Sequence, residues 1–507
     1  MISNSHYGVL IIGAGLSGIG AACHLNRHCP DIRYGIIEQR SRIGGTWDIF
    51  KYPGIRSDSD MYTLGYNFRP WTDTKMLADG PSIRQYIDDT ATENDVKKNI
   101  LFEKKISQIS WSSANSCWSV TFIDQADGTE SILTCDFVFS CTGYYRYDKG
   151  YTPEFPNAEK FGGDIIHPQN WPDNYDYKGK RVVVIGSGAT AVTLIPAMAD
   201  KTAHITMLQR SPTYVASVPE NDLVSEKLRK VIPEMLVYRL ARARNILLQR
   251  SVYELSMKKP LVVKKLLLAA TKKQLGPDVD IAHFEPNYNP WEERLCAVPK
   301  GDLFKVLREG KASVVTDQID TFTEKGIQLK SGKHLDADII ITATGLNLQL
   351  IGGADIFVDN KKLNIADEMM YKGLMMEGVP NFALMFGYTN SSWTLKSDIA
   401  SEFVCRLLNH MRRINAEKVV PVDTESNISD LNFLNLRSGY VSRADSQLPR
   451  QGKKSPWKNL DNYLQDRSAL REGDLNDGFL IFYRNGKLLI KSENKKLSKR
   501  IRSLIPI

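Results

Sequence analysis

Two glycine-rich turns, each set between a run of apolar residues and a helix-forming segment, constrain the fold of this chain more than any other feature. The first is Gly13-Ala-Gly15-Leu-Ser-Gly18, which follows Val9-Leu-Ile-Ile; the second is Gly186-Ser-Gly188-Ala-Thr-Ala191, which follows Val182-Val-Val-Ile. Apolar runs of this kind are typical of buried parallel strands. A strand, a turn of the form G-x-G-x-x-G/A and a helix together bind a dinucleotide pyrophosphate, through free backbone N–H groups and the helix N-terminus.

The residue that ends the second strand of each unit predicts which ribose the unit binds. Glu38 follows Arg33-Tyr-Gly-Ile-Ile, twenty residues after Gly18, and a carboxylate at this place accepts both hydroxyls of an unphosphorylated ribose, as in FAD. Arg210 ends the strand of residues 204–209, where a cation favours the 2′-phosphate of NADPH; a solvated strand-end residue is the alternative. Together the sites predict a flavoprotein reduced by a nicotinamide, unless one site is vestigial.

The net positive charge of the chain comes from one segment. At 507 residues, two or three domains are expected. The formal net charge is +8, but residues 226–275 contain thirteen Lys and Arg against three Glu, a net of +10, so the rest of the chain carries −2. A nucleic-acid groove is lined by positive charge, and no such groove or motif is indicated. We therefore expect no nucleic-acid partner.

The seven cysteines stand at positions 23, 29, 117, 135, 141, 296 and 405, and no two have C-x-x-C spacing. No His/Cys cluster has the spacing of metal ligands, so we expect no metal. An odd, scattered set indicates reduced thiols. There is neither a basic start followed by an apolar run nor a stretch of about 18 uncharged apolar residues. We expect a cytoplasmic protein without a transmembrane helix.

Two further turns follow Glu38. Gly44-Gly45-Thr46-Trp47 has paired glycines, which let the backbone approach a ligand closely. The rigid turn of residues 52–58 presents Asp58 and continues to Tyr62. Asp58 is either a solvated turn residue or, beside a flavin ring, a carboxylate that orients a cation.

The chain contains two similar places at which it is expected to pass from one unit to the other. Residues 83–139 predict a helix followed by a meander of short strands. The meander ends at Thr142-Gly143, and a similar buried strand ends at Thr344-Gly345.

Between these places the chain reads Phe161-Gly-Gly163-Asp-Ile-Ile-His167-Pro-Gln-Asn-Trp171-Pro172. This F-x-G-x-x-x-H-x-x-x-W-P pattern, set between two dinucleotide motifs, resembles the fingerprint of the type I Baeyer–Villiger flavin monooxygenases. The related amine- and sulfide-oxidising flavin monooxygenases usually have Tyr or Phe and then a basic residue in place of Trp171-Pro172. The resemblance extends from Val9 to about Trp457.

Within that family, Pro290-Trp-Glu-Glu-Arg294-Leu-Cys and the segment from Gly387 to Lys396 are most similar to the ethionamide-activating branch. The cyclohexanone and phenylacetone branches have a Lys immediately before the catalytic Arg, and that Lys helps to hold the 2′-phosphate. Glu293 stands at this place here, so the expected preference for NADPH rests on Arg210.

The resemblance implies an NADPH- and O₂-dependent FAD monooxygenase that forms a C4a-peroxyflavin and inserts one oxygen atom into ketones, giving esters or lactones, and that also oxidises sulfides or thioamides. Arg294 matches the catalytic arginine, whose permanent charge stabilises an anionic peroxide, and Asp58 matches the carboxylate that positions it. The resemblance also implies that NADP⁺ stays bound, that residues 390–393 open a helix facing the flavin, and that His167 couples domain rotation.

The residues expected to bind the cofactors are Gly13, Gly15, Leu16, Ser17, Gly18, Glu38, Gly45, Thr46, Trp47, Asp58, Tyr62, Gly186, Ser187, Gly188, Ala189, Thr190, Arg210, Ser211, Asn390 and Trp393. The fingerprint residues are Phe161, Gly163, His167, Trp171 and Pro172.

The expected fold is α/β, with two Rossmann-like three-layer domains and a helical insert. We expect an FAD-binding domain of residues 1–142 and 346–507, the latter ending in a basic tail, and an NADPH-binding domain of residues 143–221 and 290–345. The insert, 222–289, is strongly basic. It is either a surface insert that covers the substrate side of the nicotinamide domain or a patch that contacts a membrane surface.

Three other functions compete with Baeyer–Villiger oxidation. A sulfur- or nitrogen-oxygenating flavin monooxygenase without ketone activity is disfavoured by Trp171 and Arg294. A disulfide reductase of the same double-dinucleotide build needs a redox C-x-x-C, which the chain lacks. The third alternative is a non-enzymatic flavin sensor or scaffold, and ketone-dependent consumption of NADPH would exclude it.

Overall fold

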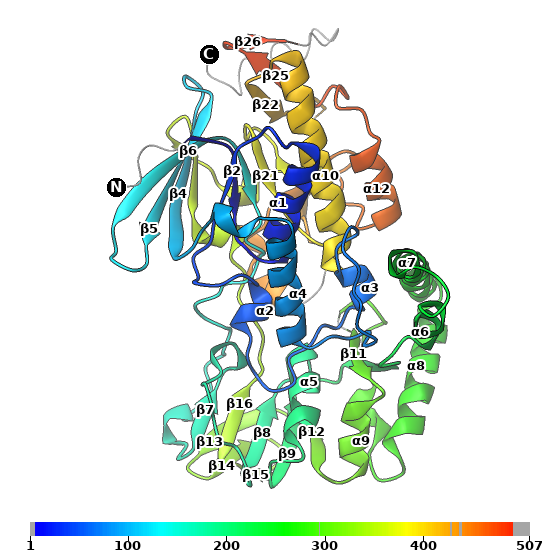
Figure 1. The fold of residues 1–507 in the computed structure, drawn as a ribbon. Helices are drawn as coiled ribbons and strands as arrows, with labels where there is room; N and C mark the ends of the chain where they lie inside the picture. The colour runs from blue at the N-terminus through cyan, green and yellow to red at the C-terminus, as the bar shows by residue number, and fades with distance from the viewer. Residues whose placement is uncertain (1–5, 294, 426–427, 435–438, 490–507) are drawn as a thin grey trace.

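The computed structural model describes residues 6–293, 295–425, 428–434 and 439–489 (Figure 1). Two sequence predictions, the catalytic Arg294 and the basic C-terminal tail from Lys495 to Arg502, lie outside the described residues. The chain forms two units, one above the other in Figure 1, and each is built on its own sheet.

The sheet of the first unit has nine strands, in the order β18-β17-β4-β5-β6-β1-β2-β3, with β21 also paired to β6. Their bounds are β1 (His6–Ile12), β2 (Tyr34–Ile37), β3 (Ile100–Leu101), β4 (Lys104–Ser112), β5 (Cys117–Asp124), β6 (Glu130–Ser140), β17 (Asp355–Val358), β18 (Lys361–Lys362) and β21 (Phe382–Leu384). β1 is parallel to both β2 and β6, and its apolar residues Val9 to Ile12 are almost fully buried. β4, β5 and β6 form the expected antiparallel meander.

Helices cover one face of this sheet. α1 (Leu16–His28) packs along α10 (Trp393–Ile414), and α4 (Gly80–Glu93) packs beside α1 (Figure 1). Every residue of α1 from Leu16 to Leu25 is buried, because the helix lies between the sheet and α10. The short helices α2 (Thr46–Ile49) and α3 (Met61–Leu64) follow the turns after Glu38.

The second unit has a five-stranded, wholly parallel sheet in the order β12-β9-β8-β16-β7. Its strands are β7 (Asp164–Ile166), β8 (Arg181–Ile185), β9 (His204–Gln209), β12 (Ala312–Thr316) and β16 (Ile339–Thr342). α5 (Ala189–Met198) and α9 (Asp302–Arg308) pack on one face. The small sheet of β13 (Ile319–Thr323), β14 (Gly326–Leu329) and β15 (His334–Asp336) packs on the other. Both units are thus layered α/β structures, as the sequence predicts.

The chain passes between the sheets twice. It leaves the first sheet after β6, just before Thr142-Gly143, and returns to it after β16, just before Thr344-Gly345.

The basic segment is helical, as expected, and it touches both units. Between β10 (Tyr214–Val218) and its parallel partner β11 (Leu295–Pro299) lie α6 (Leu223–Leu228), α7 (Glu234–Lys258) and α8 (Pro260–Leu275). α7 packs on α3 of the first unit, whereas α8 packs on α9 and β10 of the second. The insert therefore contacts the first unit as well as the second.

The remaining elements close the first unit. They are β19 (Met370–Tyr371), β20 (Met375–Met376), β22 (Lys418–Pro421), β23 (Ile428–Asn432), α11 (Gly439–Arg443), β24 (Arg450–Gly452), α12 (Tyr463–Arg471), β25 (Leu480–Arg484) and β26 (Lys487–Leu488).

Candidate active site

A cavity of about 1140 Å³ lies where the two units meet, and both glycine-rich turns reach it. Of the predicted cofactor residues, those that line it are Gly13, Gly15, Leu16, Ser17, Glu38, Gly45, Thr46, Trp47, Asp58, Gly188, Ala189, Thr190, Asn390 and Trp393. The structure thus brings together most of two motifs that lie about 170 residues apart in the sequence.

The first glycine-rich turn is packed so closely that side chains are excluded. Gly13 has a φ of 100°, and an added Cβ would lie 2.8 Å from the carbonyl oxygen of Cys141. A Cβ on Gly18 would lie 1.8 Å from the carbonyl oxygen of Gly13. Gly18 does not line the cavity, and it packs against the backbone of Gly13. Gly13 and Gly18 therefore allow backbone segments to pack in direct contact at this turn.

Gly45 brings a second stretch of bare backbone to the first turn. Its φ is 54°, and a Cβ built on it would lie 3.1 Å from Cα of Gly15. Beyond this contact the helix α1 begins, and no side chain caps its N-terminus. The uncapped N–H groups and the bare backbone suit a pyrophosphate, which needs both close approach and hydrogen-bond donors.

Glu38 is held at the cavity by backbone donors. It is 5% exposed, and its Oε2 accepts from the N–H of Ala14 at 2.7 Å while Oε1 accepts from the N–H of Arg40 at 2.9 Å. Burial raises the pKa of the Glu38 carboxyl above its ordinary value, and the two backbone donors oppose that shift. The geometry fits a ribose-binding acid, since the second lone pairs of a carboxylate remain able to accept from hydroxyls.

The second glycine-rich turn reaches the cavity with its last part. Gly186 has a φ of 136°, and a Cβ there would lie 2.3 Å from the carbonyl oxygen of Ala343. Gly188, Ala189 and Thr190 line the cavity at the start of α5, whose N-terminus also has no side-chain cap. Two uncapped helix N-termini thus serve one cavity, which fits two dinucleotides.

The other residues of the second motif lie beside the cavity lining. The Ser187 hydroxyl bonds with the Thr213 hydroxyl at 2.8 Å and donates to the carbonyl of Ser211. Arg210 is exposed and comes directly after β9. Its place at the carboxyl end of the strand next to β8 is the place expected of a 2′-phosphate ligand.

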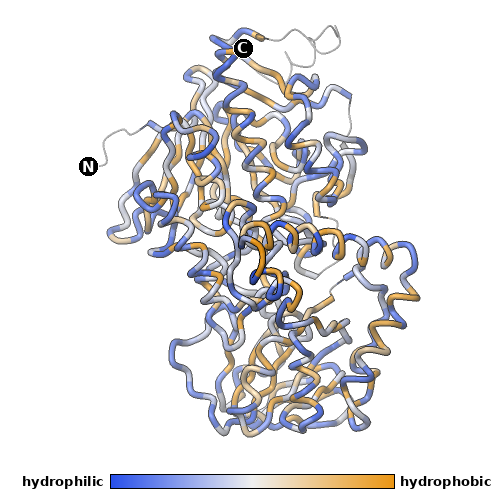
Figure 2. Tube along the Cα trace, turned by 45° about the vertical axis from the view of Figure 1, so that its right-hand side comes forward, coloured by the Kyte–Doolittle hydropathy of each residue, from blue (hydrophilic) through white to orange (hydrophobic). Residues whose placement is uncertain are grey.

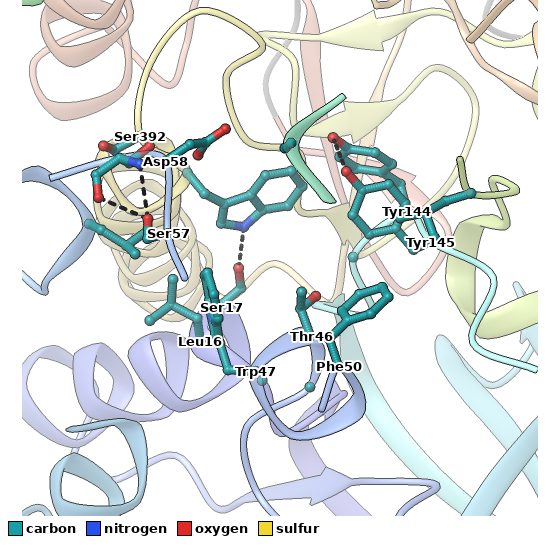
Figure 3. Close-up of a pocket in the computed structure, with 18 of the residues that line it drawn as sticks. Leu16, Ser17, Thr46, Trp47, Phe50, Ser57, Asp58, Tyr144, Tyr145 and Ser392 are labelled. Atoms are coloured by element: carbon teal, nitrogen blue, oxygen red, sulfur yellow. Dashed lines mark hydrogen bonds between the residues drawn. The ribbon is translucent and has the colours of Figure 1, made fainter. Parts of the chain in front are cut away.

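Asp58 lines the cavity on the side away from Tyr144 and Tyr145 (Figure 3). The neighbouring Arg56 forms an ion pair with Asp302 of α9, with 2.6 Å between Nη1 and Oδ2. Burial raises the pKa of the Asp302 carboxyl, and the charge of Arg56 counteracts that effect. This turn therefore links the first unit to the second beside the cavity.

Arg294 lies outside the described residues, but its neighbours in the chain are described. Glu293 and Leu295 both line the cavity, as does Trp291. Trp291 has a φ of 72°, an uncommon conformation for an aromatic residue, and its indole stacks edge-on against Tyr253 of α7. The segment that carries Arg294 thus forms part of the cavity wall on both sides of it.

The start of α10 lies at the cavity. The helix begins at Trp393, whose indole Nε1–H donates to the hydroxyl of Ser17. Asn390 donates from Nδ2 to the carbonyl of Asp461 at 2.8 Å. A Cβ on Gly387 would lie 2.2 Å from the indole ring of Trp393, which explains a glycine there.

The fingerprint residues lie outside the cavity lining. His167 Nδ1 accepts from the N–H of Gln169 at 3.2 Å, and Nε2 lies 3.1 Å from the carbonyl oxygen of Gly345. A Cβ on Gly163 would lie 2.2 Å from the carbonyl oxygen of Asp338. Phe161 is in the core of the second unit, and Trp171, followed by the exposed Pro172, packs edge-on against two tyrosines.

Tyr62 also lies away from the cavity lining. Its side chain is 1% exposed, and its ring centroid is 6.1 Å from that of Tyr238 in α7. The reason is the helix α3, on which Tyr62 faces the basic segment.

Sequence reasoning did not identify the side of the cavity formed by α7. Leu248, Gln249, Val252 and Tyr253 line it, and Asn245 holds Asp60, another lining residue. Asp60 accepts 2.8 Å from Asn245 Nδ2 and 2.7 Å from Gln249 Nε2. The signal in the sequence that could have indicated this wall is the helical spacing of these residues, which places them all on one face of α7.

Among the described residues, no group of His, Cys, Asp and Glu could hold a metal ion. The described helices also include none with the length and hydropathy to cross a bilayer.

Comparison with known proteins agrees with this geometry. The family described as FMO-like, flavin-binding monooxygenase-like, matches residues 7–420. MymA of Mycobacterium tuberculosis, whose name describes an FAD-containing monooxygenase, is 53% identical over 484 residues, covering 94% of this chain and 98% of its own. The FAD-containing monooxygenase EthA of the same organism is 50% identical over 479 residues, covering 94% and 98%.

Solved structures show the same fold. An open form of cyclohexanone monooxygenase superposes with a TM-score of 0.75 at 18% identity, covering 94% of this chain and 100% of its own. OTEMO in complex with FAD and NADP superposes with a TM-score of 0.69 at 22% identity, covering 82% and 88%. The chain therefore belongs to the flavin-binding monooxygenase-like family, and it is a flavin-dependent monooxygenase that uses FAD and NADPH.

Proposed function

We propose that this flavin monooxygenase inserts one oxygen atom of O₂ into ketones, in a Baeyer–Villiger reaction that gives esters or lactones, and that it also oxidises sulfides or thioamides. The observation that carries the proposal is the shared cavity: Asp58, Glu293 and Leu295 line the same space as both dinucleotide turns. The Trp171-Pro172 fingerprint supports ketone oxidation over oxidation of sulfur or nitrogen alone.

For the cofactors, we assign the first turn, Glu38 and the start of α10 to FAD, and the second turn with Arg210 to NADPH. Residues 1–142 and 346–507 then form the FAD-binding domain, residues 143–221 and 290–345 the NADPH-binding domain, and residues 222–289 the insert between them. In this assignment, the backbone of Gly13, Gly15 and Gly45 contacts the pyrophosphate of FAD, and the carboxylate of Glu38 accepts from the ribose hydroxyls.

Bound FAD, after reduction by NADPH, supplies activated oxygen from O₂. The chain's own contribution is a fixed positive charge at the carbonyl under attack. A preorganised donor at a developing oxyanion contributes about 3–4 kcal/mol. We assign this role to Arg294, because an arginine keeps its proton against a basic oxygen. Asp58 is the carboxylate that positions it.

The walls of the cavity suit an apolar substrate. Leu248, Val252 and Tyr253 of α7 line it together with Trp291 and Leu295, and the ring of Tyr253 contacts that of Trp291. A water-poor site strengthens the attraction between a guanidinium and an oxyanion. The substrate class that fits is a small ketone or sulfide with an apolar body. A peripheral membrane contact through the basic helices is a separate proposal, which concerns their solvent-facing side.

Product analysis tests the function. Purified enzyme is incubated with NADPH, ¹⁸O₂ and a panel of linear, cyclic and aromatic ketones, in parallel with the matching sulfides. Esters or lactones that contain one ¹⁸O atom, formed together with NADPH consumption, are the expected result. Sulfoxides without any ester from the whole ketone panel would contradict ketone oxidation and favour the sulfur- or nitrogen-oxygenating alternative.

A further inference from the structure

Apolar side chains are concentrated on the outside of the basic segment. Thirteen of the twenty exposed large apolar side chains among the described residues lie between Leu223 and Leu266. We define the α7–α8 surface by six of them, with exposed fractions from 47% to 67%: Leu236, Leu240 and Leu247 of α7, and Leu261, Val262 and Leu266 of α8. Figure 2 shows the corresponding apolar stretches along both helices.

The rotation of α7 is fixed by buried polar contacts, so its apolar face cannot turn inward. Arg242 donates to Asp398 Oδ2 at 3.1 Å and to the carbonyl of Gly65 at 2.7 Å. Asn245 and Gln249 both donate to Asp60 on the same side of the helix. Residues 236, 240 and 247 are spaced by four and seven, which places them on one face, opposite these anchors.

Lysines accompany the apolar side chains. Lys258 and Lys259 stand at the junction of the two helices, and Lys265, Lys272 and Lys273 share the exposed side of α8 with Leu261 and Leu266. The segment of residues 226–275 carries a net charge of +10, whereas the rest of the chain carries −2. Exposed leucines beside lysines match a surface that is anionic outside and apolar beneath.

We propose that the α7–α8 surface docks the enzyme on an anionic lipid bilayer. The lysines bind lipid phosphates, and the leucine and valine side chains enter the boundary between head groups and acyl chains. The helices lie on the bilayer and do not cross it. A nucleic acid offers the same negative charge but no apolar layer to cover six exposed aliphatic side chains.

The docking surface is continuous with the cavity. Leu248 and Val252 line the cavity and are themselves 60% and 44% exposed, and Leu248 directly follows Leu247 of the α7–α8 surface. A substrate dissolved in the bilayer therefore meets an apolar path along α7 into the site. This last step rests on the proposed function, because it assumes that the cavity oxidises an apolar substrate.

Vesicle co-sedimentation of the FAD-loaded enzyme tests the docking. Vesicles of phosphatidylcholine with about 30 mol% phosphatidylglycerol are compared with pure phosphatidylcholine vesicles at low salt. The enzyme is expected to bind the anionic vesicles at least about ten-fold more strongly, and about 0.5 M NaCl is expected to weaken the binding. The triple variant Lys265→Glu, Lys272→Glu, Lys273→Glu should lose about ten-fold or more of the affinity.

Matched variants separate docking from unspecific effects. The control for charge is Lys325→Glu, Lys330→Glu, Lys333→Glu, three exposed lysines of the second unit. A variant with Leu236→Ser, Leu240→Ser and Leu247→Ser should also lose binding, unlike one with Ile132→Ser, Leu431→Ser and Leu488→Ser, which are exposed elsewhere. All variants should oxidise NADPH with a water-soluble sulfide at the rate of the unaltered enzyme.

The proposal is wrong if the unaltered enzyme fails to bind anionic vesicles, or if the control variants lose as much binding as the α7–α8 variants. It is also wrong if the serine variant converts a dimer into a monomer without any change in vesicle binding, because the surface is then an interface between copies. The function is judged separately: absence of any oxygenated product from soluble substrates refutes it and leaves the vesicle result standing.

Discussion

The indole Nε1–H of Trp393 donates a hydrogen bond of 2.7 Å to the hydroxyl of Ser17, although the two residues are 376 positions apart. Ser17 is the second residue of α1 and Trp393 the first of α10, and both line the cavity. The bond therefore joins the N-termini of the two helices that we assign to FAD binding.

Replacement of Trp393 by Phe removes this donor and keeps most of the ring. A neutral hydrogen bond contributes about 1 kcal/mol, so the dissociation constant of FAD should rise about five-fold, as measured by fluorescence titration of the apoenzyme. Ser17→Ala should have a similar effect, and the double variant should lose little more than either single variant. Fully additive losses would show that the two side chains act independently.

Arg210→Ala should raise the KM for NADPH by about ten-fold or more and leave the KM for NADH nearly unchanged, because a cation at this place recognises the 2′-phosphate. Steady-state kinetics with both coenzymes measure the ratio. Arg412→Ala, at an exposed site of the first unit, is the matched control. An equal loss with NADH and NADPH would contradict the role of Arg210.

Arg294→Ala should lower the rate of ester formation about 100- to 1000-fold, the usual effect of removing an oxyanion donor. Reduction of the flavin by NADPH, followed by stopped-flow absorbance, should proceed normally, since it needs no oxyanion. Arg294→Lys keeps the charge and should retain part of the activity. If sulfoxidation persists in the alanine variant while esters disappear, the two reactions share a site but not this residue.

The parts of the fold that depend on local sequence were predictable. The turns at Gly13 and Gly186 need positive φ and close backbone approach, and these demands are visible as glycine spacing. The face that α7 presents to the cavity was not predictable, because Asn245 is positioned by Asp60, a residue 185 positions away. The same holds for Tyr62, whose direction is set by packing against α7.

Arg242→Met should destabilise the protein by about 3–5 kcal/mol, because it leaves the buried Asp398 without its cation. The guanidinium also binds the carbonyls of Tyr62 and Gly65, which then lose a donor. The shift of the urea unfolding midpoint measures the effect. Arg239→Met, at an exposed site of α7 three residues before Arg242, should change the midpoint little. Equal shifts in both variants would show that Arg242 is no special anchor of α7.

His167 should make the stability of the protein fall at mildly acidic pH. Burial lowers the pKa of its imidazole below the ordinary 6.5. The neutral ring is the form that fits, because Nδ1 accepts from Gln169 while Nε2–H donates to Gly345. The folded state then binds fewer protons than the unfolded state between the two pKa values. The contribution of His167 is complete above pH 6.5 and is lost as the pH falls below 6.5 through the lower folded pKa.

His167→Gln isolates this effect, since a glutamine amide also accepts with one atom and donates with the other but does not titrate. Melting temperatures of both proteins are compared between about pH 7.5 and pH 5. The other histidines are the same in both proteins, so their effects cancel in the difference. The unaltered enzyme should lose more stability than the variant below pH 6.5, and the gap between them should stop growing once the folded pKa is passed. A difference that stays constant with pH would mean that His167 acts through packing alone and that its protonation has no part in the contact with Gly345.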